Sequence, residues 1–393
     1  MKKLNILILF FLTTYGFSQV TISTLTPSFK GSGGLSLDEE GNLYIGDFGD
    51  FLGIPDPDGL PNDVIKLDTD LNLTQYSTGF IGASGNDFDS NGILYQSDIR
   101  DNAIFKIING VRTFVTSTGI SSPVGIVFDS NDNFYVCNCG NGTIQKVTPS
   151  GTSTQFASGG SFTCPNGITV DENDNLYVSN FSNNKIVKIT PAGVTSVIGV
   201  TALGNGHLDY DINSRNLYIA SYSGHQIYSL NIDDLEIHPI AGSGVRGNMD
   251  GLGLEATFST PNGVAVSKTG DSIYVNCAVP LTGAEINPQI VRLITGLTFG
   301  IEDRTAINYN QKVYPNPVQN SFTIEANIPS NFETLSIKLF DILGRELMEL
   351  QDLSVVSTQF EKTIDISNLG TGTYFYSVYS DARQLFNGKI IKE

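Results

Sequence analysis

The stretch PNGITVDENDNLYVSNFSNNKIVKITPAG, residues 165–193, decides the fold class of this chain. It contains three short runs in which apolar and polar residues alternate, and clusters of Asn, Asp, Gly and Pro separate these runs. Alternation with a period of two, bounded by turn residues, is typical of β-strands and not of helices. The stretch therefore predicts an antiparallel meander. Because such a sheet cannot bury both faces by itself, further copies must pack against it.

Five further copies of this unit lie along the chain. Each copy contains a pair of an apolar residue and a tyrosine: Leu43-Tyr44, Leu94-Tyr95, Phe134-Tyr135, Leu176-Tyr177, Leu217-Tyr218 and Ile273-Tyr274. A run that usually ends in Asp precedes the pair, a third alternating run follows it, and a weaker fourth run fits before the next copy. Four strands repeated about every 40 residues are typical of a propeller blade. We therefore predict an all-β fold with a six-bladed β-propeller over residues 19–300.

A propeller ring needs a closing strand, because an open sheet edge is prone to aggregate. The sixth copy has only three clear strands, whereas residues 20–25 alternate as the outer strands of the other copies do. We expect residues 20–25 to pair with the third strand of the last blade. Residues 297–301 are the alternative closing segment.

The charge of the chain and its N-terminal segment indicate where the protein is located and which partners it lacks. The 393 residues carry a formal net charge of −18, which argues against nucleic acid as a partner, since phosphate binding needs clustered Lys and Arg. Residues 1–18 have a basic start, a short apolar run and a small polar end, which predicts a secretory signal peptide cleaved after Ser18. No later run of about twenty apolar residues follows, so we expect no transmembrane segment in the mature chain.

Export permits disulfides, and the chain has four cysteines. Cys139 follows the second strand of the third blade, and Cys164 precedes the first strand of the fourth, so both loops would share one face of adjacent blades. We predict a disulfide between them, worth about 3 kcal/mol. Pairing of Cys137 with Cys164 is the alternative, and Cys137 and Cys277 are otherwise expected to be free.

The propeller copies resemble a known family. Residues 241–258, AGSGVRGNMDGLGLEATF, followed by PNGVAV at 261–266, resemble the NHL-repeat propellers, as do the LYV-x-[DN] segments. Related propellers of the gluconolactonase type hold a metal in the central channel through Glu, Asn and Asp at the start of the innermost strands. The equivalent positions in this sequence are Gly33, Ser84, Val124, Asn166, Gly206 and Asn262, and a one-residue bulge would add Asn205.

The resemblance thus implies a channel-mouth site at Asn166, Asn205 and Asn262, with Ca²⁺ as the metal that oxygen ligands favour. None of these positions is acidic, and Asn-Gly also forms turns readily. His207 and Asp209 could act as a general base pair for lactone or ester hydrolysis.

Two further sets of carboxylates are candidate metal ligands. Asp47 and Asp98 end second strands, where polar residues usually bond to backbone amides. Asp56 and Asp58 lie in the first-blade insert DFLGIPDPDGLPND, but the full calcium-loop spacing is missing, so a solvated acidic loop is the simpler interpretation.

After a linker at 301–308 the pattern changes. Short strands separated by Pro, Asn and Gly turns predict a small Ig-like β-sandwich over residues 309–393. The segments VYPNPV, LSIKLFDILGR, GTGTYFYSV and GKIIKE resemble the type A sorting domain of type IX secretion substrates in Bacteroidota. The signature residues are Tyr314, Pro315, Asn316, Pro317, Gly344, Gly372, Tyr374 and Lys389. The resemblance implies the type IX machinery as a partner and delivery to the outer-membrane surface or the medium.

These observations favour a secreted or cell-surface propeller that acts as a binding module for a protein, peptide or glycan. Recognition would use the loops at the channel mouth and the two inserts, because loops vary while blades are fixed by packing. The alternative is a metal-dependent hydrolase of the gluconolactonase type that acts in the channel.

Overall fold

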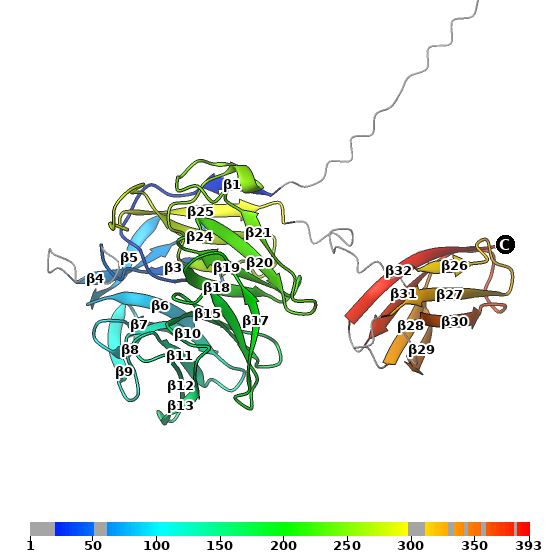
Figure 1. Cartoon of the computed structure of the whole chain (residues 1–393), viewed down its shortest axis with the longest axis horizontal. Coiled ribbons are helices and arrows are strands. Elements are labelled where there is room, and N and C mark those ends of the chain that lie inside the picture. The colour runs from blue at the N-terminus through cyan, green and yellow to red at the C-terminus, as the bar shows by residue number, and fades with distance from the viewer. Residues whose placement is uncertain are drawn as a thin grey trace, which may run out of the picture. The chain divides into compact units, whose positions relative to one another are not determined.

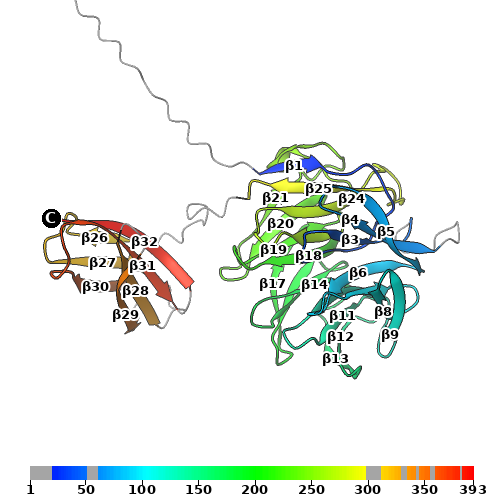
Figure 2. The ribbon, with the colours of Figure 1, turned by 180° about the vertical axis from the view of Figure 1, so that it is seen from behind.

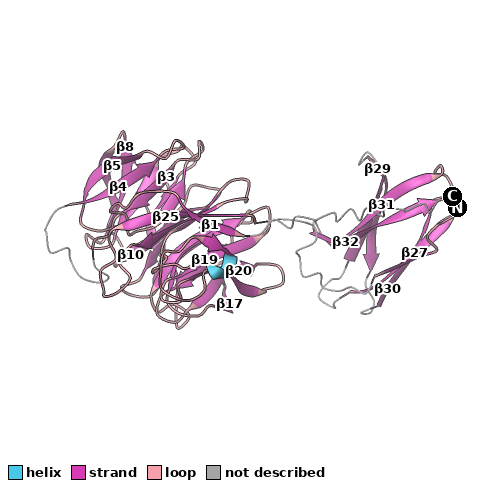
Figure 3. Ribbon diagram, turned by 90° about the horizontal axis from the view of Figure 1, so that it is seen from above, coloured by secondary structure: helices cyan, strands magenta, loops and turns pink. Residues whose placement is uncertain are grey.

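The structure, a computed structural model, describes residues 20–50, 61–297, 311–328, 334–341, 345–354, 359–380 and 383–393. The chain divides into two compact units between residues 299 and 300, and both are built from β-strands (Figure 1). Among the described residues, a single short 3-10 helix, η1 (Gly253–Glu255), interrupts this pattern (Figure 3). Within the same residues, no helix has the length and apolar character to cross a membrane.

Several sequence predictions fall outside the described residues. They concern the signal peptide at 1–18, the acidic insert residues Asp56 and Asp58, the linker at 301–308 and the signature glycine Gly344. These remain predictions.

The first unit contains six antiparallel sheets, five of which are formed by four consecutive strands. The first three sheets consist of β2 (Leu35–Leu37), β3 (Leu43–Gly46), β4 (Asn62–Leu67) and β5 (Leu73–Phe80); β6 (Ala83–Phe88), β7 (Leu94–Asp98), β8 (Ala103–Ile108) and β9 (Val111–Thr116); and β10 (Pro123–Phe128), β11 (Phe134–Asn138), β12 (Thr143–Val147) and β13 (Ser153–Ser158).

The remaining three sheets complete the unit. They consist of β14 (Pro165–Val170), β15 (Leu176–Asn180), β16 (Lys185–Ile189) and β17 (Thr195–Val200); β18 (Asn205–Asp211), β19 (Asn216–Ser221), β20 (Gln226–Asn231) and β21 (Ile237–Ala241); and β23 (Val264–Val266), β24 (Ile273–Ala278), β25 (Gln289–Thr295), β1 (Thr21–Thr24) and β22 (Gly251–Leu252). The first strands β2, β6, β10, β14, β18 and β23 each neighbour the next, and β23 neighbours β2. The sheets are therefore the blades of a closed propeller (Figures 1 and 2).

The N-terminal strand closes the ring as predicted. β1 pairs antiparallel with β25, with Ile22 opposite Ile294. The fully buried Arg292 on β25 donates to Asp250 of the fifth-blade insert at 2.8 Å, and Asp250 in turn accepts from the Thr24 backbone N–H at 3.1 Å. This chain of contacts fastens the closing strand, the insert and the last blade to one another.

In the first, third and fourth blades, the tyrosine of the apolar-tyrosine pair closes a hairpin. Asp171 accepts hydrogen bonds from the backbone N–H groups of Asn173 and Asn175, both at 2.9 Å, and from the Tyr177 hydroxyl at 2.9 Å. The same arrangement holds at Asp38 and Tyr44, and at Asp129 and Tyr135. The turns between first and second strands lie on one face of the propeller, here called the hairpin face.

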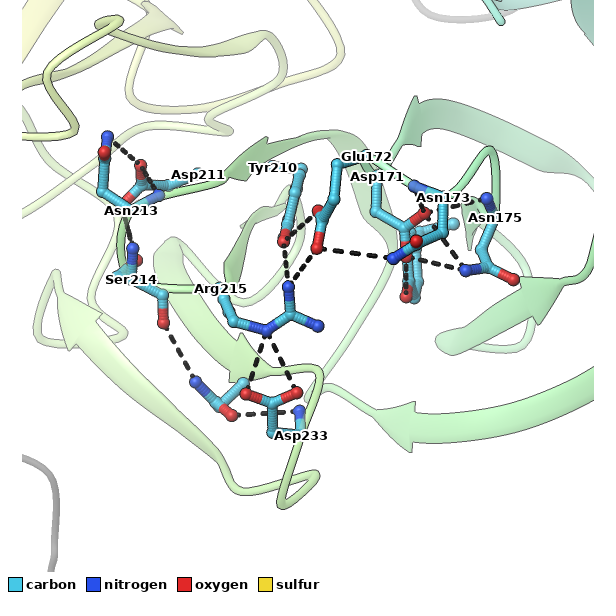
Figure 4. A network of polar contacts seen from close by, with 12 residues as sticks. Asp171, Glu172, Asn173, Asn175, Tyr210, Asp211, Asn213, Ser214, Arg215 and Asp233 are labelled. Carbon is cyan, nitrogen blue, oxygen red and sulfur yellow. Dashed lines mark hydrogen bonds and ion pairs between the residues drawn. The ribbon is translucent and has the colours of Figure 1, made fainter. Parts of the chain in front are cut away.

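Neighbouring blades are bonded to each other on the hairpin face. Figure 4 shows Arg215 of the fifth blade between Glu172 of the fourth blade and Asp233 of its own blade. The Tyr210 hydroxyl also donates to Glu172 at 2.9 Å. Because these contacts join separate blades, they resist opening of the ring between the fourth and fifth blades.

The second unit is a β-sandwich. One sheet is formed by β26 (Lys312–Tyr314), β27 (Ser321–Asn327) and β30 (Gln359–Asp365), and the other by β29 (Glu346–Ser354), β28 (Thr334–Phe340), β31 (Gly372–Ser380) and β32 (Arg383–Lys392). Inward residues of both sheets, including Phe322, Ile337, Val378 and Ile390, form one core. The predicted two-layer architecture is confirmed.

Candidate functional site

His207 occupies the centre of the propeller channel. Strand pairing places it at the position where the other five blades have Gly34, Gly85, Gly125, Gly167 and Gly263. A Cβ atom on Gly34 or on Gly85 would lie only 2.8 Å or 3.0 Å from the His207 Cε1 atom. The imidazole therefore reaches from the fifth blade to the first and second blades, on the other side of the channel.

The His207 imidazole is buried and forms no hydrogen bond with the described residues. Only 8% of its surface is exposed, and its Nε2 atom is fully buried with no partner among the described residues. Burial lowers the pKa of His207 to about 4, so the ring is neutral at physiological pH. A buried polar atom that lacks a partner in the protein is commonly satisfied by a water or a ligand.

His207 and Asp209 do not form the hydrogen-bonded pair that the general-base hypothesis requires. Asp209 accepts from the Thr169 hydroxyl at 3.2 Å and from the backbone N–H groups of Tyr210 and Val266, both at 2.8 Å. Both carboxylate oxygens of Asp209 are thus hydrogen-bonded to residues of the neighbouring strands. No hydrogen bond joins Asp209 to His207 within the described chain, so the orientation that a catalytic dyad needs is absent there.

A second channel carboxylate, Asp87, was not predicted from the sequence. Strand pairing places Asp87 of the second blade at the position that Asp209 holds in the fifth. Its carboxylate accepts from the Phe128 backbone N–H at 3.1 Å. Burial raises the pKa of Asp87 to about 7, and the charge of Asp209 adds to this effect. Burial likewise raises the pKa of Asp209 to about 6. Asp87 precedes Asp89 by two residues, as Asp209 precedes Asp211, so an alignment of the repeats carried a signal that could have identified it.

The candidate asparagines mainly bond blades together. Asn166 donates from Nδ2 to the Asn205 carbonyl at 3.0 Å, and Asn262 donates to the Ser32 carbonyl at 2.7 Å. The Asn166 Oδ1 atom is buried and lacks a partner among the described residues. Asn205 is not equivalent to Asn166 and Asn262. A bulge in the fifth blade alone would have aligned it with them, but the bulge occurs in four blades, so Asn205 aligns with Pro165. Its side chain instead accepts from the Thr201 hydroxyl.

These residues do not fit the divalent metal that the resemblance implies. The six positions at the start of the inner strands hold no carboxylate, whereas hard cations in proteins usually have at least one. In the described residues, no three His, Cys, Asp or Glu side chains are grouped as metal ligands.

An apolar cap covers the channel on the face opposite the hairpin face, here called the loop face. The cap consists of Phe48, Tyr222 and Ile286, which are buried, with Ile99 and Phe181 packed against them. The rings of Phe181 and Tyr222 meet edge to face, with centroids 5.6 Å apart. Four of these residues follow second strands of different blades, and Ile286 belongs to a sixth-blade loop. The loops of five blades therefore converge over the polar interior that contains His207.

The third blade contributes to this face through a disulfide. Cys139 stands where the other blades place cap residues, and it is bonded to Cys164 of the fourth blade. The predicted pairing is confirmed, and Cys137 and Cys277 are free thiols inside the blades.

Asp47 and Asp98 shape loops on the same face. Asp98 accepts from the backbone N–H groups of Ile81 at 2.8 Å and Gly82 at 2.9 Å. Asp47 accepts from the Ser32 hydroxyl and from the Asn287 amide, both at 2.9 Å. These contacts correspond to the loop-holding role that is usual for polar residues at strand ends.

The signature residues of the second unit lie on its strands and turns. Tyr314 ends β26 and is exposed, and the Pro315 and Pro317 peptide bonds are cis. Asn316 accepts from the Ile391 backbone N–H at 2.9 Å and donates to the Lys389 carbonyl at 3.0 Å. Gly372 begins β31, and the Tyr374 hydroxyl donates to the Gly370 carbonyl at 2.9 Å.

Comparison with known families supports both units. The family described as "Secretion system C-terminal sorting domain" matches residues 312–393, and the NHL repeat matches residues 121–147 and 162–189. A search of curated proteins found no match to the sequence.

Three solved structures share the propeller fold. A structural genomics protein of unknown function from Bacteroides thetaiotaomicron is 17% identical with a TM-score of 0.56, and the match covers 70% of this chain and 76% of that one. An auxiliary nutrient binding protein from Bacteroides ovatus is 13% identical, with a TM-score of 0.55 and the same two coverages. A gluconolactonase from Xanthomonas campestris is 13% identical, with a TM-score of 0.54 and coverages of 71% and 91%.

The sorting-domain match indicates type IX secretion to the cell surface or the extracellular space. The chain therefore contains NHL repeats within a closed six-bladed β-propeller, a fold that it shares with the gluconolactonase from Xanthomonas campestris, and a C-terminal region that matches the sorting-domain family.

Proposed function

We propose that the propeller is an extracellular binding module that takes a small ligand in the channel beneath the apolar cap. The observation that carries this proposal is the His207 imidazole, which is buried, neutral and unbonded to the described residues at its Nε2 atom. A neutral imidazole whose Nε2 carries the lone pair would accept a hydrogen bond from a ligand hydroxyl or amine.

The surroundings of His207 suggest the chemistry of that ligand. The Asn166 Oδ1 atom, on the neighbouring blade, is a second buried acceptor without a partner in the described chain. Phe48 and Tyr222 of the cap supply apolar, partly aromatic surface on the loop-face side. Small-molecule sites commonly combine such apolar walls with a few polar groups that fix orientation. A polyhydroxylated or amine-bearing ligand with one apolar face meets both requirements.

The hydrolase alternative is less well supported. Asp209 is committed to Thr169, Tyr210 and Val266, so it does not orient the imidazole. The ring of inner-strand positions lacks the carboxylate that a channel metal needs. The gluconolactonase from Xanthomonas campestris shares the fold at 13% identity, which does not transfer its activity.

A ligand panel separates the two functions. Mono- and oligosaccharides, amines and short peptides are tested for a shift in the thermal midpoint of the mature propeller and of His207→Gly, which restores the glycine of the other blades. A compound that stabilises only the wild-type protein supports the proposal, because stabilisation follows from binding to the folded state. Gluconolactone or aryl acetate turnover that needs Ca²⁺ and stops with chelator would favour the hydrolase. His238→Ala, an exposed histidine on β21, is the matched control.

A further inference from the structure

Two carboxylates occupy opposing walls of the channel near the hairpin face. Strand pairing places Asp87 of β6 and Asp209 of β18 at the same position of the second and fifth blades, which lie opposite each other in a ring of six. The equivalent positions of the other blades hold uncharged residues, namely Ser36, Val127, Thr169 and Ala265. The two acids are therefore the charged residues of this layer of the channel.

Within the described residues, no basic side chain neutralises the two carboxylates. The strands packed against β6 and β18 are β2, β3, β4, β7, β10, β14, β15, β19 and β23. The single basic residue in these strands is Lys66 of β4, which lies 4.0 Å from Asp38 instead. The other titratable residues of these strands are acids and phenols, namely Tyr44, Asp63, Tyr95, Asp98, Tyr177 and Tyr218.

The uncompensated charge is unfavourable in the free protein. Burial raises the pKa of Asp87 to about 7, with a further contribution from Asp209, and burial raises the pKa of Asp209 to about 6, with a further contribution from Asp211. Buried charges in proteins are usually paired. The backbone N–H groups of Phe128 and Val266 that donate to these carboxylates could donate equally to a neutral amide. The hydrogen bonds within the fold therefore do not account for the charge of the pair.

The imidazole of His207 lies in the adjacent layer of the same channel. His207 precedes Asp209 by two residues on β18, and Gly85 precedes Asp87 by two residues on β6. A Cβ atom on Gly85 would lie 3.0 Å from the His207 Cε1 atom, and two residues of strand span about 7 Å. The buried Nε2 atom, which lacks a partner among the described residues, is thus within reach of a molecule that also contacts the carboxylates.

The hairpin face offers access to these groups. The apolar cap covers the channel on the loop face, whereas Asp87 and Asp209 each remain partly exposed. A ligand that enters from the hairpin face therefore passes between the two carboxylates before it reaches His207.

We propose that the channel ligand is a protonated amine whose ammonium group binds between Asp87 and Asp209, while a second donor of the same molecule bonds to His207. This inference rests on the proposed binding function, and it adds the charge of the ligand and the face from which the ligand enters. An ammonium group supplies three donors and one positive charge, and carboxylates accept such donors in charge-assisted hydrogen bonds.

The test measures binding to the secreted chain at pH 7 by isothermal titration calorimetry, with two matched pairs of probes. Glucosamine is compared with N-acetylglucosamine, and tyramine with its neutral alcohol analogue tyrosol. At least one amine should bind about tenfold more tightly than its neutral counterpart, and Asp87→Asn and Asp209→Asn should each remove this preference. Asp70→Asn, at an exposed aspartate in the turn between β4 and β5, is the matched control and should bind as the wild-type protein does.

The affinity for the amine should also depend on pH. Lowering the pH from 7 to 5 protonates Asp87 and Asp209, while the primary amine stays charged and His207 stays largely neutral. The affinity should therefore fall about tenfold or more, because protons compete with the ammonium group for the carboxylates. Asp87→Asn should reduce this dependence on pH.

The thermal midpoint of each variant reports whether it is folded. If Asp209→Asn is unfolded, Asp87→Asn decides the question, because an amide can still accept the bond from the Phe128 N–H. Neutral probes that bind as tightly as the amines, or amine binding that Asp87→Asn leaves unchanged, would overturn this proposal and leave the channel-binding function intact. Failure of both amines to bind, or Ca²⁺ binding that excludes them and is lost in Asp87→Asn, would also overturn it, and the wider ligand panel then tests the proposed function separately.

Discussion

Replacing His207 by glycine should change how stability depends on pH. Folding lowers the pKa of His207 from 6.5 to about 4 through burial, a difference of about 2.5 pKa units that corresponds to about 3 kcal/mol in total. Because the unfolded chain binds the proton more readily, this stability is complete above pH 6.5 and is lost as the pH falls toward 4. About 2 kcal/mol of it should be lost by pH 5.

The His207→Gly variant should not show this loss of stability at low pH, because it lacks the titrating imidazole. At pH 7.5 its stability should be close to that of the wild-type protein, because relief of the unpaired Nε2 atom offsets the entropy cost of glycine, each about 1 kcal/mol. Between pH 7.5 and 5, the variant should gain about 2 kcal/mol relative to wild type. Asp87 and Asp209 titrate in both proteins, so their contributions largely cancel in the difference.

Urea denaturation of the mature propeller, without ligand, measures this difference. The chain has no tryptophan, so far-ultraviolet circular dichroism or tyrosine fluorescence reports unfolding. His238→Ala controls for the loss of a histidine elsewhere. A difference between wild type and His207→Gly that stays constant from pH 7.5 to 5 would show that the imidazole is not desolvated in the channel, and the account of the site would fail.

Four further predictions follow from other contacts. Asp87→Asn should leave stability unchanged below about pH 4 and raise it by about 4 kcal/mol at pH 8, because burial raises the pKa of Asp87 from 3.8 to about 7 and the unfolded chain releases the proton between these pH values while the folded chain keeps it; urea titrations at both pH values test this. Cys139→Ser should lower the unfolding free energy by about 3 kcal/mol, and reduction of the wild-type protein should match it. Arg292→Met should cost about 1–3 kcal/mol, because it removes the buried donors to Asp250 and to the Thr257 and Met249 carbonyls, whereas Lys268→Met, at an exposed ion pair, should cost less than about 1 kcal/mol. Deletion of residues 309–393 should retain the protein in the periplasm by cell fractionation, and normal surface delivery would refute the sorting role.

The sequence predicted the architecture because repeated patterns report repeated environments. The apolar residue of the repeated pair is buried in every blade, and in three blades the tyrosine bonds to the aspartate of the preceding turn. The closing strand at residues 20–25 was predictable from alternation together with the missing strand of the sixth copy. The cysteine pair followed from the expected position of two loops on one face.

The site was predicted less well because its chemistry depends on contacts between separate blades. His207 was a candidate by residue type, but the contact of its imidazole with Gly34 and Gly85 across the channel follows from closure of the ring. The bulge that four blades share aligns Asn205 with Pro165 and so removes Asn205 from the candidate set. The cap formed by Phe48, Tyr222 and Ile286 joins residues of three blades, and no local pattern marks such a contact.

Electron density in the channel tests the central claim most directly. The protein is purified from the culture that secretes it, without added ligand, and the propeller is crystallised at high resolution. The account predicts density for an organic ligand beneath Phe48 and Tyr222, with a hydrogen bond to the His207 Nε2 atom. A channel that contains only water, or a metal ion held by Asn166 and Asn262 in a protein that hydrolyses lactones, would contradict it.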